Sequence, residues 1–256
     1  MGRNLALGAF FILAFGLSAE ARVFQIGEES FAAYLRGQYG VAGQKDEPFA
    51  PASGAGSKFS DEYKTNMSYE FGFVYATPKV SLRIGFEFLK PADLKDMKGT
   101  DSGGGTEYYS VSNNISGFIP KVGVELNFKQ WAQSRLFASA NYGMATVTVQ
   151  NSYTFTPAGV TAYPTPGADF REEIKGDGSL VEGSLGFETL LSDSTTIVLD
   201  AGYRTLEVGS FKHNVDSKGF QGNVSKGDTA KNTNGSDRTL NLNGGFVGLM
   251  IRVWIK

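Results

Sequence analysis

The sequence predicts an all-β protein, an eight-stranded antiparallel up-and-down β-barrel that spans a membrane. Three observations predict this fold: eight segments alternate between apolar and polar residues, short and long connections alternate between those segments, and the chain begins with an export signal. The composition agrees, because the 256 residues include 33 glycines and 13% aromatic residues but no cysteine. With a single histidine and a net charge of -2, we expect no cofactor, no metal site and no nucleic-acid partner.

The first 21 residues have the pattern of a secretory signal peptide. Arg3 gives a positive start, residues 5–17 form an apolar run, and Ala19-Glu20-Ala21 supplies a cleavage site with small residues. The apolar run is shorter than the roughly 20 residues that a transmembrane helix needs. We therefore expect a signal peptide over residues 1–21 and a single barrel domain over residues 22–256.

Eight segments alternate with a period of two, which is the pattern of a β-strand with two different faces. In one of them, Met67, Phe71 and Tyr75 share a face and Glu70 lies on the other. Most are close to the 9–11 residues with which a tilted strand crosses a bilayer. The predicted strands are residues 31–41, 67–75, 80–88, 118–128, 136–144, 181–191, 197–205 and 247–255.

The connections between these strands are alternately long and short. An up-and-down barrel places all its long loops at one end and all its tight turns at the other, so this alternation favours the barrel. The short connections are residues 76–79, 129–135 and 192–196, and the long ones are residues 42–66, 89–117, 145–180 and 206–246. We expect some outer residues of the long connections to extend the strands beyond the membrane.

The two faces of the strands differ in a way that favours a lipid-facing exterior. The apolar face carries no charged residue, whereas the polar face combines glycines with five positive and six negative residues. Small residues suit the narrow lumen of an eight-stranded barrel, and nearly balanced charges suit an enclosed ion-pair network with a structural role. A soluble, lipocalin-like secreted barrel with its charges turned outward is the alternative. The predicted lumen network consists of Arg36, Glu70, Arg83, Glu87, Lys121, Glu125, Glu182, Glu188, Asp200, Arg204 and Arg252.

This combination of signal peptide, eight strands, three tight turns and four long loops resembles the small outer-membrane barrels of Gram-negative bacteria. The similar types are the OmpA transmembrane domain, OmpX-like and OmpW-like proteins, and the resemblance covers essentially the whole mature chain. It implies an integral outer-membrane protein that contacts membrane lipids and lipopolysaccharide and is inserted by the outer-membrane assembly machinery. Such barrels usually end on an aromatic residue, whereas this chain ends with Ile255 and Lys256, a departure that bears on assembly in an unrelated host.

The function that this reading favours is a non-enzymatic surface protein, with a structural role, a surface-interaction role, or both. The charge-filled lumen stabilises the barrel, and the four long loops meet the outside, where they contact a surface ligand or a host protein. The candidate loop-binding residues are Lys212, Lys218, Lys226, Lys231 and Arg238.

A narrow channel or a conduit for hydrophobic solutes, as in OmpW-like proteins, is the first alternative function. Eight-stranded barrels are filled by side chains, which disfavours a general diffusion pore. A partly apolar passage would be lined by the apolar residues of inward parity, which are Phe137, Val198, Phe246 and Met250.

A lipid-modifying enzyme is the second alternative. His213 is the one candidate general base, with Ser210 and Glu207 close to it in the sequence. A lone histidine in a loop is more often a solvated side chain than a catalytic one, so we expect no enzymatic activity.

Overall fold

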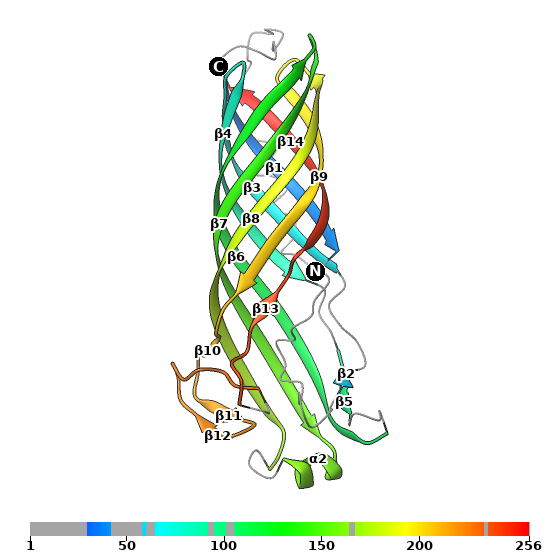
Figure 1. The fold of residues 1–256 in the computed structure, drawn as a ribbon, viewed down its shortest axis with the longest axis vertical. Helices are drawn as coiled ribbons and strands as arrows, with labels where there is room; N and C mark the ends of the chain where they lie inside the picture. Colours follow the sequence, from blue (N-terminus) through cyan, green and yellow to red (C-terminus); the bar gives the residue numbers. More distant parts are fainter. Residues whose placement is uncertain are drawn as a thin grey trace, which may run out of the picture.

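A computed structural model of the chain describes residues 30–41, 58–59, 65–91, 95–100, 105–163, 167–232 and 235–255, so the expected signal peptide lies outside the described residues. Eight long strands pair antiparallel in the order β1-β3-β4-β6-β7-β8-β9-β14, and pairing of β1 with β14 closes the ring (Figure 1). The prediction of an eight-stranded barrel is thereby confirmed. These strands are β1 (Ser30–Val41), β3 (Thr65–Ala76), β4 (Val80–Pro91), β6 (Glu107–Gln130), β7 (Ser134–Phe155), β8 (Phe170–Ser192), β9 (Thr195–Val208) and β14 (Gly244–Ile255).

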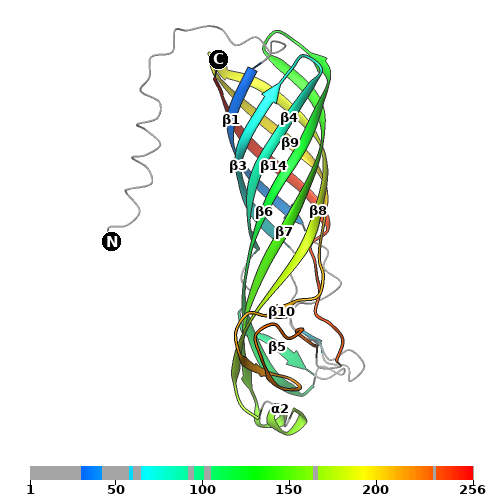
Figure 2. The ribbon, with the colours of Figure 1, turned by 90° about the vertical axis from the view of Figure 1, so that its left-hand side faces the viewer.

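The two ends of the barrel differ in their connections. Strands β3 and β4, β6 and β7, and β8 and β9 are joined by tight turns at one end, where the described chain also begins and ends (Figure 2). The short elements lie at the other end and are β2 (Lys58–Phe59), β5 (Met97–Thr100), α2 (Pro157–Ala162), β10 (Lys212–His213), β11 (Ser217–Gly219), β12 (Gly222–Val224) and β13 (Leu240–Asn241). None of the helices in the described residues is long and apolar enough to cross a membrane.

The apolar face of the barrel strands points outward. Leu185 is 65% exposed and Ile84 is 57% exposed, whereas Glu87 and Arg252 on the opposite face are fully buried. Aromatic rings form a row across the outer surface, in which Phe86 stacks on Phe118 with 6.0 Å between ring centroids. A water-exposed surface would present the charges instead, so this orientation excludes the lipocalin-like alternative and defines a barrel surrounded by lipid.

Three strands continue far beyond the lipid-facing belt. Strands β6, β7 and β8 have 24, 22 and 23 residues, and their outer parts occupy much of the predicted long connections 89–117 and 145–180 (Figure 2). The expectation that outer residues of the long connections extend the strands is therefore confirmed, and the extensions reach well beyond the predicted strand bounds. Physically, the strands persist because their hydrogen-bonded pairing continues as far as Tyr109↔Phe155 and Tyr153↔Phe170.

The polarity of these three strands is reversed outside the belt. In the outer part of β7, the buried inward residues are apolar, as at Val147 and Val149, and the outward ones are polar, as at Thr146 and Gln150. In the part of β7 that lipid surrounds, the inward residues are instead polar, as at Ser139 and Asn141. Because water rather than lipid surrounds the outer parts, the reversal marks the outer boundary of the bilayer near Met144.

The outer parts of β6, β7 and β8 form the wall of a separate lobe. We use "the lobe" for these extensions together with β5, α2 and the described residues between 209 and 243. Its apolar core includes the aromatic residues Tyr109, Tyr153, Phe170, Phe211 and Phe220. The chain between β9 and β14 covers the inner face of the wall, since Phe211, Leu240 and Leu242 belong to the same core. The molecule thus has two interiors, one charged and one apolar, that share continuous strands.

Candidate functional site

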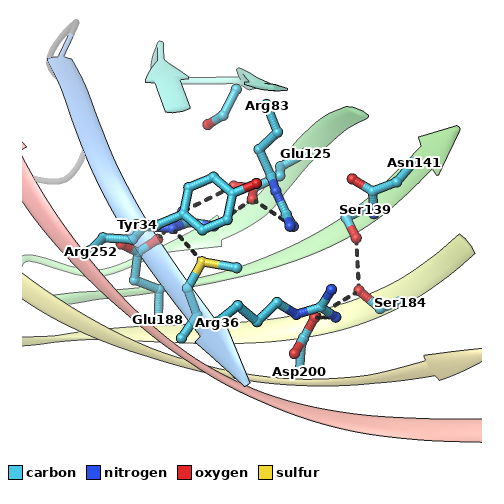
Figure 3. A network of polar contacts seen from close by, with 12 residues as sticks. Tyr34, Arg36, Arg83, Glu125, Ser139, Asn141, Ser184, Glu188, Asp200 and Arg252 are labelled. Atoms are coloured by element: carbon cyan, nitrogen blue, oxygen red, sulfur yellow. Dashed lines mark hydrogen bonds and ion pairs between the residues drawn. The ribbon is translucent and has the colours of Figure 1, made fainter. Parts of the chain in front are cut away.

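The centre of the lumen is organised around Arg36, which β1 points into the barrel. Its Nη1 atom lies 2.9 Å from Glu182 and 3.2 Å from Glu70. Its Nη2 atom lies 2.5 Å from Asp200, and Figure 3 shows this pair. The four side chains come from β1, β3, β8 and β9, so this cluster ties opposite walls of the barrel together. Both Nη atoms of Arg36 have carboxylate partners, whereas its Nε atom and Oδ1 of Asp200 have no hydrogen-bond partner. Charged hydrogen bonds between dry side chains are stronger than neutral ones, so these pairs hold the four strands together.

A second cation, Lys121 of β6, joins the same cluster. Its Nζ atom lies 2.6 Å from Glu70 and 2.8 Å from Glu87, and Glu87 also receives a hydrogen bond of 2.8 Å from Arg204. All these side chains are almost completely buried, so water does not screen them.

A second cluster lies closer to the tight turns. Glu125 is paired with Arg252 at 2.5 Å and with Arg135 at 2.8 Å, and Glu188 is paired with Arg252 at 2.9 Å and with Arg135 at 2.6 Å. Arg83 links the two clusters, since its guanidinium lies 2.9 Å from Glu70 and 3.6 Å from Glu125. The structure therefore brings all eleven predicted lumen residues into one connected set of ion pairs.

Arg135 belongs to this set but was missed by the sequence analysis. It lies one residue before the predicted strand 136–144, on the same inward parity as Phe137 and Ser139. The surplus of one negative charge among the predicted lumen residues was the signal for a missing cation. With Arg135 included, six cations face six carboxylates, and the formal charge of the network is zero.

Aromatic and apolar side chains close the lumen towards the tight turns. The guanidinium carbons of Arg135 and Arg252 lie 4.9 Å and 5.6 Å from the ring centroid of Phe137, which is a cation–π arrangement. Trp254 donates a hydrogen bond of 3.0 Å to Thr196, and Thr196 in turn donates one of 2.5 Å to Glu188. Of the residues that the conduit alternative placed along a passage, Phe137, Val198 and Met250 are buried in one apolar cluster with Trp254. The fourth, Phe246, is also buried, and the guanidinium carbon of Arg36 lies 5.2 Å from its ring centroid.

The packing around inward-facing glycines shows how full the lumen is. A Cβ atom on Gly248 would lie 2.1 Å from Oδ1 of Asp200, and one on Gly186 would lie 2.3 Å from Cζ of Phe137. These distances are far below van der Waals contact, so the lumen side chains occupy the space that the glycines leave.

The lobe contains a buried ion pair of its own. Arg238 forms a salt bridge with Glu172 of β8, and the same carboxylate oxygen accepts hydrogen bonds from Asn151 at 3.0 Å and Tyr153 at 3.2 Å. Burial by itself would lower the pKa of Arg238, but the Glu172 carboxylate together with Tyr153 raises it, and the net result is a guanidinium pKa above its ordinary value. Arg238 is thus an internal residue of the lobe, and its assignment to the exposed loop-binding residues is wrong.

The other four candidate loop-binding residues lie on the surface of the lobe. Lys212, Lys218, Lys226 and Lys231 are exposed, and Lys231 forms an ion pair with Asp237. Lys98 of β5 pairs with Glu107 of β6 at 2.8 Å. Exposed pairs of this kind contribute little to stability. The four lysines are accessible to a partner because their side chains are exposed.

The structure does not assemble the residues of the enzymatic alternative. His213 is only 3% exposed and its Nδ1 atom has no hydrogen-bond partner, whereas Ser210 donates to Asp237 at 2.9 Å. Burial lowers the pKa of His213 below its ordinary value, against the opposing field of Glu172. The expectation of a solvated histidine is therefore wrong. Within the described part of the chain, no three histidine, aspartate or glutamate side chains come together as metal ligands.

Comparison with known proteins gives similarities of fold only. No family model and no curated protein sequence matches the chain. The outer membrane protein OprG from Pseudomonas aeruginosa has a TM-score of 0.47 at 11% identity, covering 91% of this chain and 99% of that one. A major outer membrane protein from Thermus thermophilus has a TM-score of 0.45 at 12% identity, covering 86% and 98%. Ail from Yersinia pestis has a TM-score of 0.40 at 11% identity, covering 90% and 99%.

The chain's own geometry defines its class. A closed antiparallel ring, a lipid-facing apolar belt and a charged interior are together the properties of an integral outer-membrane β-barrel. The lobe stands on the side of the long connections, which in such barrels is the outer face of the membrane.

Proposed function

We propose that this chain is a non-enzymatic outer-membrane protein whose barrel is a closed anchor and whose lobe carries a surface-interaction role. The observation that carries the proposal is the filled lumen. Among the described residues, six buried cations are matched by six buried carboxylates, so the network has no net charge to attract a passing ion. An interior of this kind stabilises a scaffold and leaves little room for transport.

The alternative of a narrow channel or hydrophobic-solute conduit has less support. Its proposed lining residues are packed against Trp254 and Arg36, and the guanidinium groups of Arg135 and Arg252 both contact the ring of Phe137. A solute would have to displace these side chains and break ion pairs to pass, which is costly in a dry interior.

The lobe supports the interaction role because it is built as a folded unit rather than as free loops. It combines an apolar core, a buried Arg238–Glu172 pair and a surface that presents Lys212, Lys218 and Lys226. We further propose that residues 1–21 are removed as a signal peptide, and that residues 22–256 are inserted by the outer-membrane assembly machinery into a layer of lipids and lipopolysaccharide. A surface ligand or a host protein is the proposed partner of the lobe.

The conductance of the refolded protein in a planar lipid bilayer tests the closed barrel. Folding is first checked by the heat-dependent shift in electrophoretic mobility in SDS. We expect no steady channel current from the wild-type protein. A double variant, Phe137→Ala with Trp254→Ala, removes the apolar closure and is expected to give more frequent openings. A steady current through the folded wild-type barrel would contradict the anchor and favour the channel.

The absence of enzymatic activity is tested separately by mass spectrometry of lipid A from cells that express the chain. We expect the same lipid A species with the wild-type protein, with His213→Ala and with an empty vector. A modified species that disappears in His213→Ala would overturn the non-enzymatic assignment.

A further inference from the structure

The part of the lobe between β9 and β14 contains a pocket that the proposed function does not use. Its volume is about 230 Å³, smaller than the roughly 300–1,000 Å³ of sites for drug-sized ligands. Buried His213, Phe220 and Arg238 form its inner wall, and exposed Gln221 and Asn223 line its rim. The pocket is therefore open to the outside and large enough for one small ring.

The backbone around the pocket is held by short antiparallel segments. His213 donates its backbone N–H to Asp228 at 2.8 Å, Ala230 donates to Phe211 at 2.8 Å, and Arg238 donates to Ala230 at 3.0 Å. Phe211 and Ala230 are themselves part of the apolar core of the lobe. The walls of the pocket are thus fixed before any ligand arrives, which lowers the entropic cost of binding.

The inner wall of the pocket includes a buried imidazole. His213 lines the pocket although it is 97% removed from solvent, and its Nδ1 atom has no hydrogen-bond partner. The lowered pKa of His213 keeps the imidazole neutral at pH 7, which gives the ring one donor and one acceptor.

The charged groups that line the pocket are each engaged by the protein. Asp228 accepts a hydrogen bond of 2.7 Å from the backbone N–H of Ser225, and Lys231 pairs with Asp237. Arg238 on the inner wall is already neutralised by Glu172. The remaining lining offers both donors and acceptors, from the amides of Gln221 and Asn223 and the hydroxyl of Thr229, beside the aromatic ring of Phe220.

We infer that this pocket binds a neutral sugar ring, as one unit of a glycan outside the cell. A ring with several hydroxyl groups both donates and accepts hydrogen bonds, carries no charge and has an apolar face for Phe220. The inference rests on the proposed surface-interaction role and specifies the chemistry of the partner.

Saturation-transfer NMR on the full chain in lipid nanodiscs tests this inference, with free glucose, galactose, mannose and N-acetylglucosamine as probes and glucuronate and phosphate as charged comparisons. We expect at least one neutral sugar to bind, and we expect at least tenfold weaker binding in Asn223→Ala and in Gln221→Ala. The matched control is Asn114→Ala, which removes an exposed amide from the outer face of β6 and is expected to bind like the wild type.

The outcomes separate this inference from the proposed function. Binding of the charged probes alone, no binding of any neutral sugar, or equal binding in all the variants would overturn the sugar site. The heat-dependent mobility and the lack of conductance would stand in each of these cases, since they depend on the barrel. Competition of the bound sugar by purified lipopolysaccharide oligosaccharide or by yeast mannan then distinguishes a glycan of the bacterial envelope from a foreign one.

Discussion

Replacing Arg36 by methionine removes the cation from the centre of the lumen while keeping a long side chain. Arg36 contacts Glu70, Glu182 and Asp200, but the consequences for these three carboxylates differ. Glu70 and Glu182 keep Lys121 at 2.6 Å and 3.8 Å, whereas Asp200 has no other ion pair with a described residue. Its nearest remaining donor is the hydroxyl of Ser184 at 3.5 Å. The variant therefore leaves one buried carboxylate without a counter-charge.

The expected cost follows from that isolation. Breaking a buried ion pair by removing one partner costs about 3–5 kcal/mol, because the other charge stays in a dry environment. With a slope of about 2 kcal/mol per M of urea, the midpoint of unfolding falls by about 2 M. Adding Asp200→Asn to Arg36→Met removes the stranded charge, so the double variant is expected to recover most of this loss.

The assay is urea unfolding of the protein in lipid vesicles, followed by tryptophan fluorescence, since Trp254 is buried at the closed end of the barrel. Arg83→Met is the matched control. Glu70 keeps Lys121 and Glu125 keeps Arg252, so we expect less than half of the Arg36→Met effect. Equal midpoints for the wild type and Arg36→Met, or a double variant no more stable than the single one, would refute the network as the source of stability.

Three further predictions concern packing and the lobe. Gly186→Val places atoms against the ring of Phe137 and is expected to lower barrel stability by about 1–3 kcal/mol. The control is Gly183→Val on the outward face of β8, which should leave the urea midpoint nearly unchanged. Equal effects of the two variants would argue against a filled lumen. Arg238→Ala leaves Glu172 buried and unpaired, so hydrogen exchange of residues 211–242 is expected to accelerate. The heat-dependent mobility of the barrel should persist in this variant. Loss of the mobility shift together with the exchange protection would mean that lobe and barrel fold as one unit. Because the pKa of His213 is lowered in the folded lobe, the unfolded segment takes up a proton first as the pH falls, so lobe stability is full above about pH 6.5 and declines below it. Exchange protection of residues 228–231, corrected for intrinsic rates, measures this decline, and His213→Phe should abolish it.

The barrel could be predicted from the sequence because lipid imposes a simple rule on each strand. Alternation with an uncharged outer face identified all eight strands, and the same parity named the lumen residues that the structure buries. Arg135 was missed because the predicted strand began at Leu136, where the apolar outer face begins, although the inward parity continues one residue further.

The lobe could not be predicted in the same way. Residues 145–155 alternate as regularly as the barrel strands, but their apolar residues point inward, opposite to the phase that lipid requires. The burial of Arg238 depends on Glu172, which is 66 residues away in the chain. Neither partner carries a local signal, because their contact is created by the packing of the β9–β14 connection on the wall of the lobe.

The unbroken pairing of β7 with β8 also fixes the height at which the molecule meets its surroundings. From the bilayer boundary near Met144 to Phe155 the strand advances by eleven residues, or roughly 36 Å at about 3.3 Å per residue. At a tilt of roughly 40°, its tip stands about 28 Å above the hydrocarbon layer. Because the pairing of β7 with β8 continues without a register shift as far as Tyr153↔Phe170, the lobe is held rigidly to the barrel. Whatever it recognises is met at a set distance and angle, beyond the headgroups closest to the membrane.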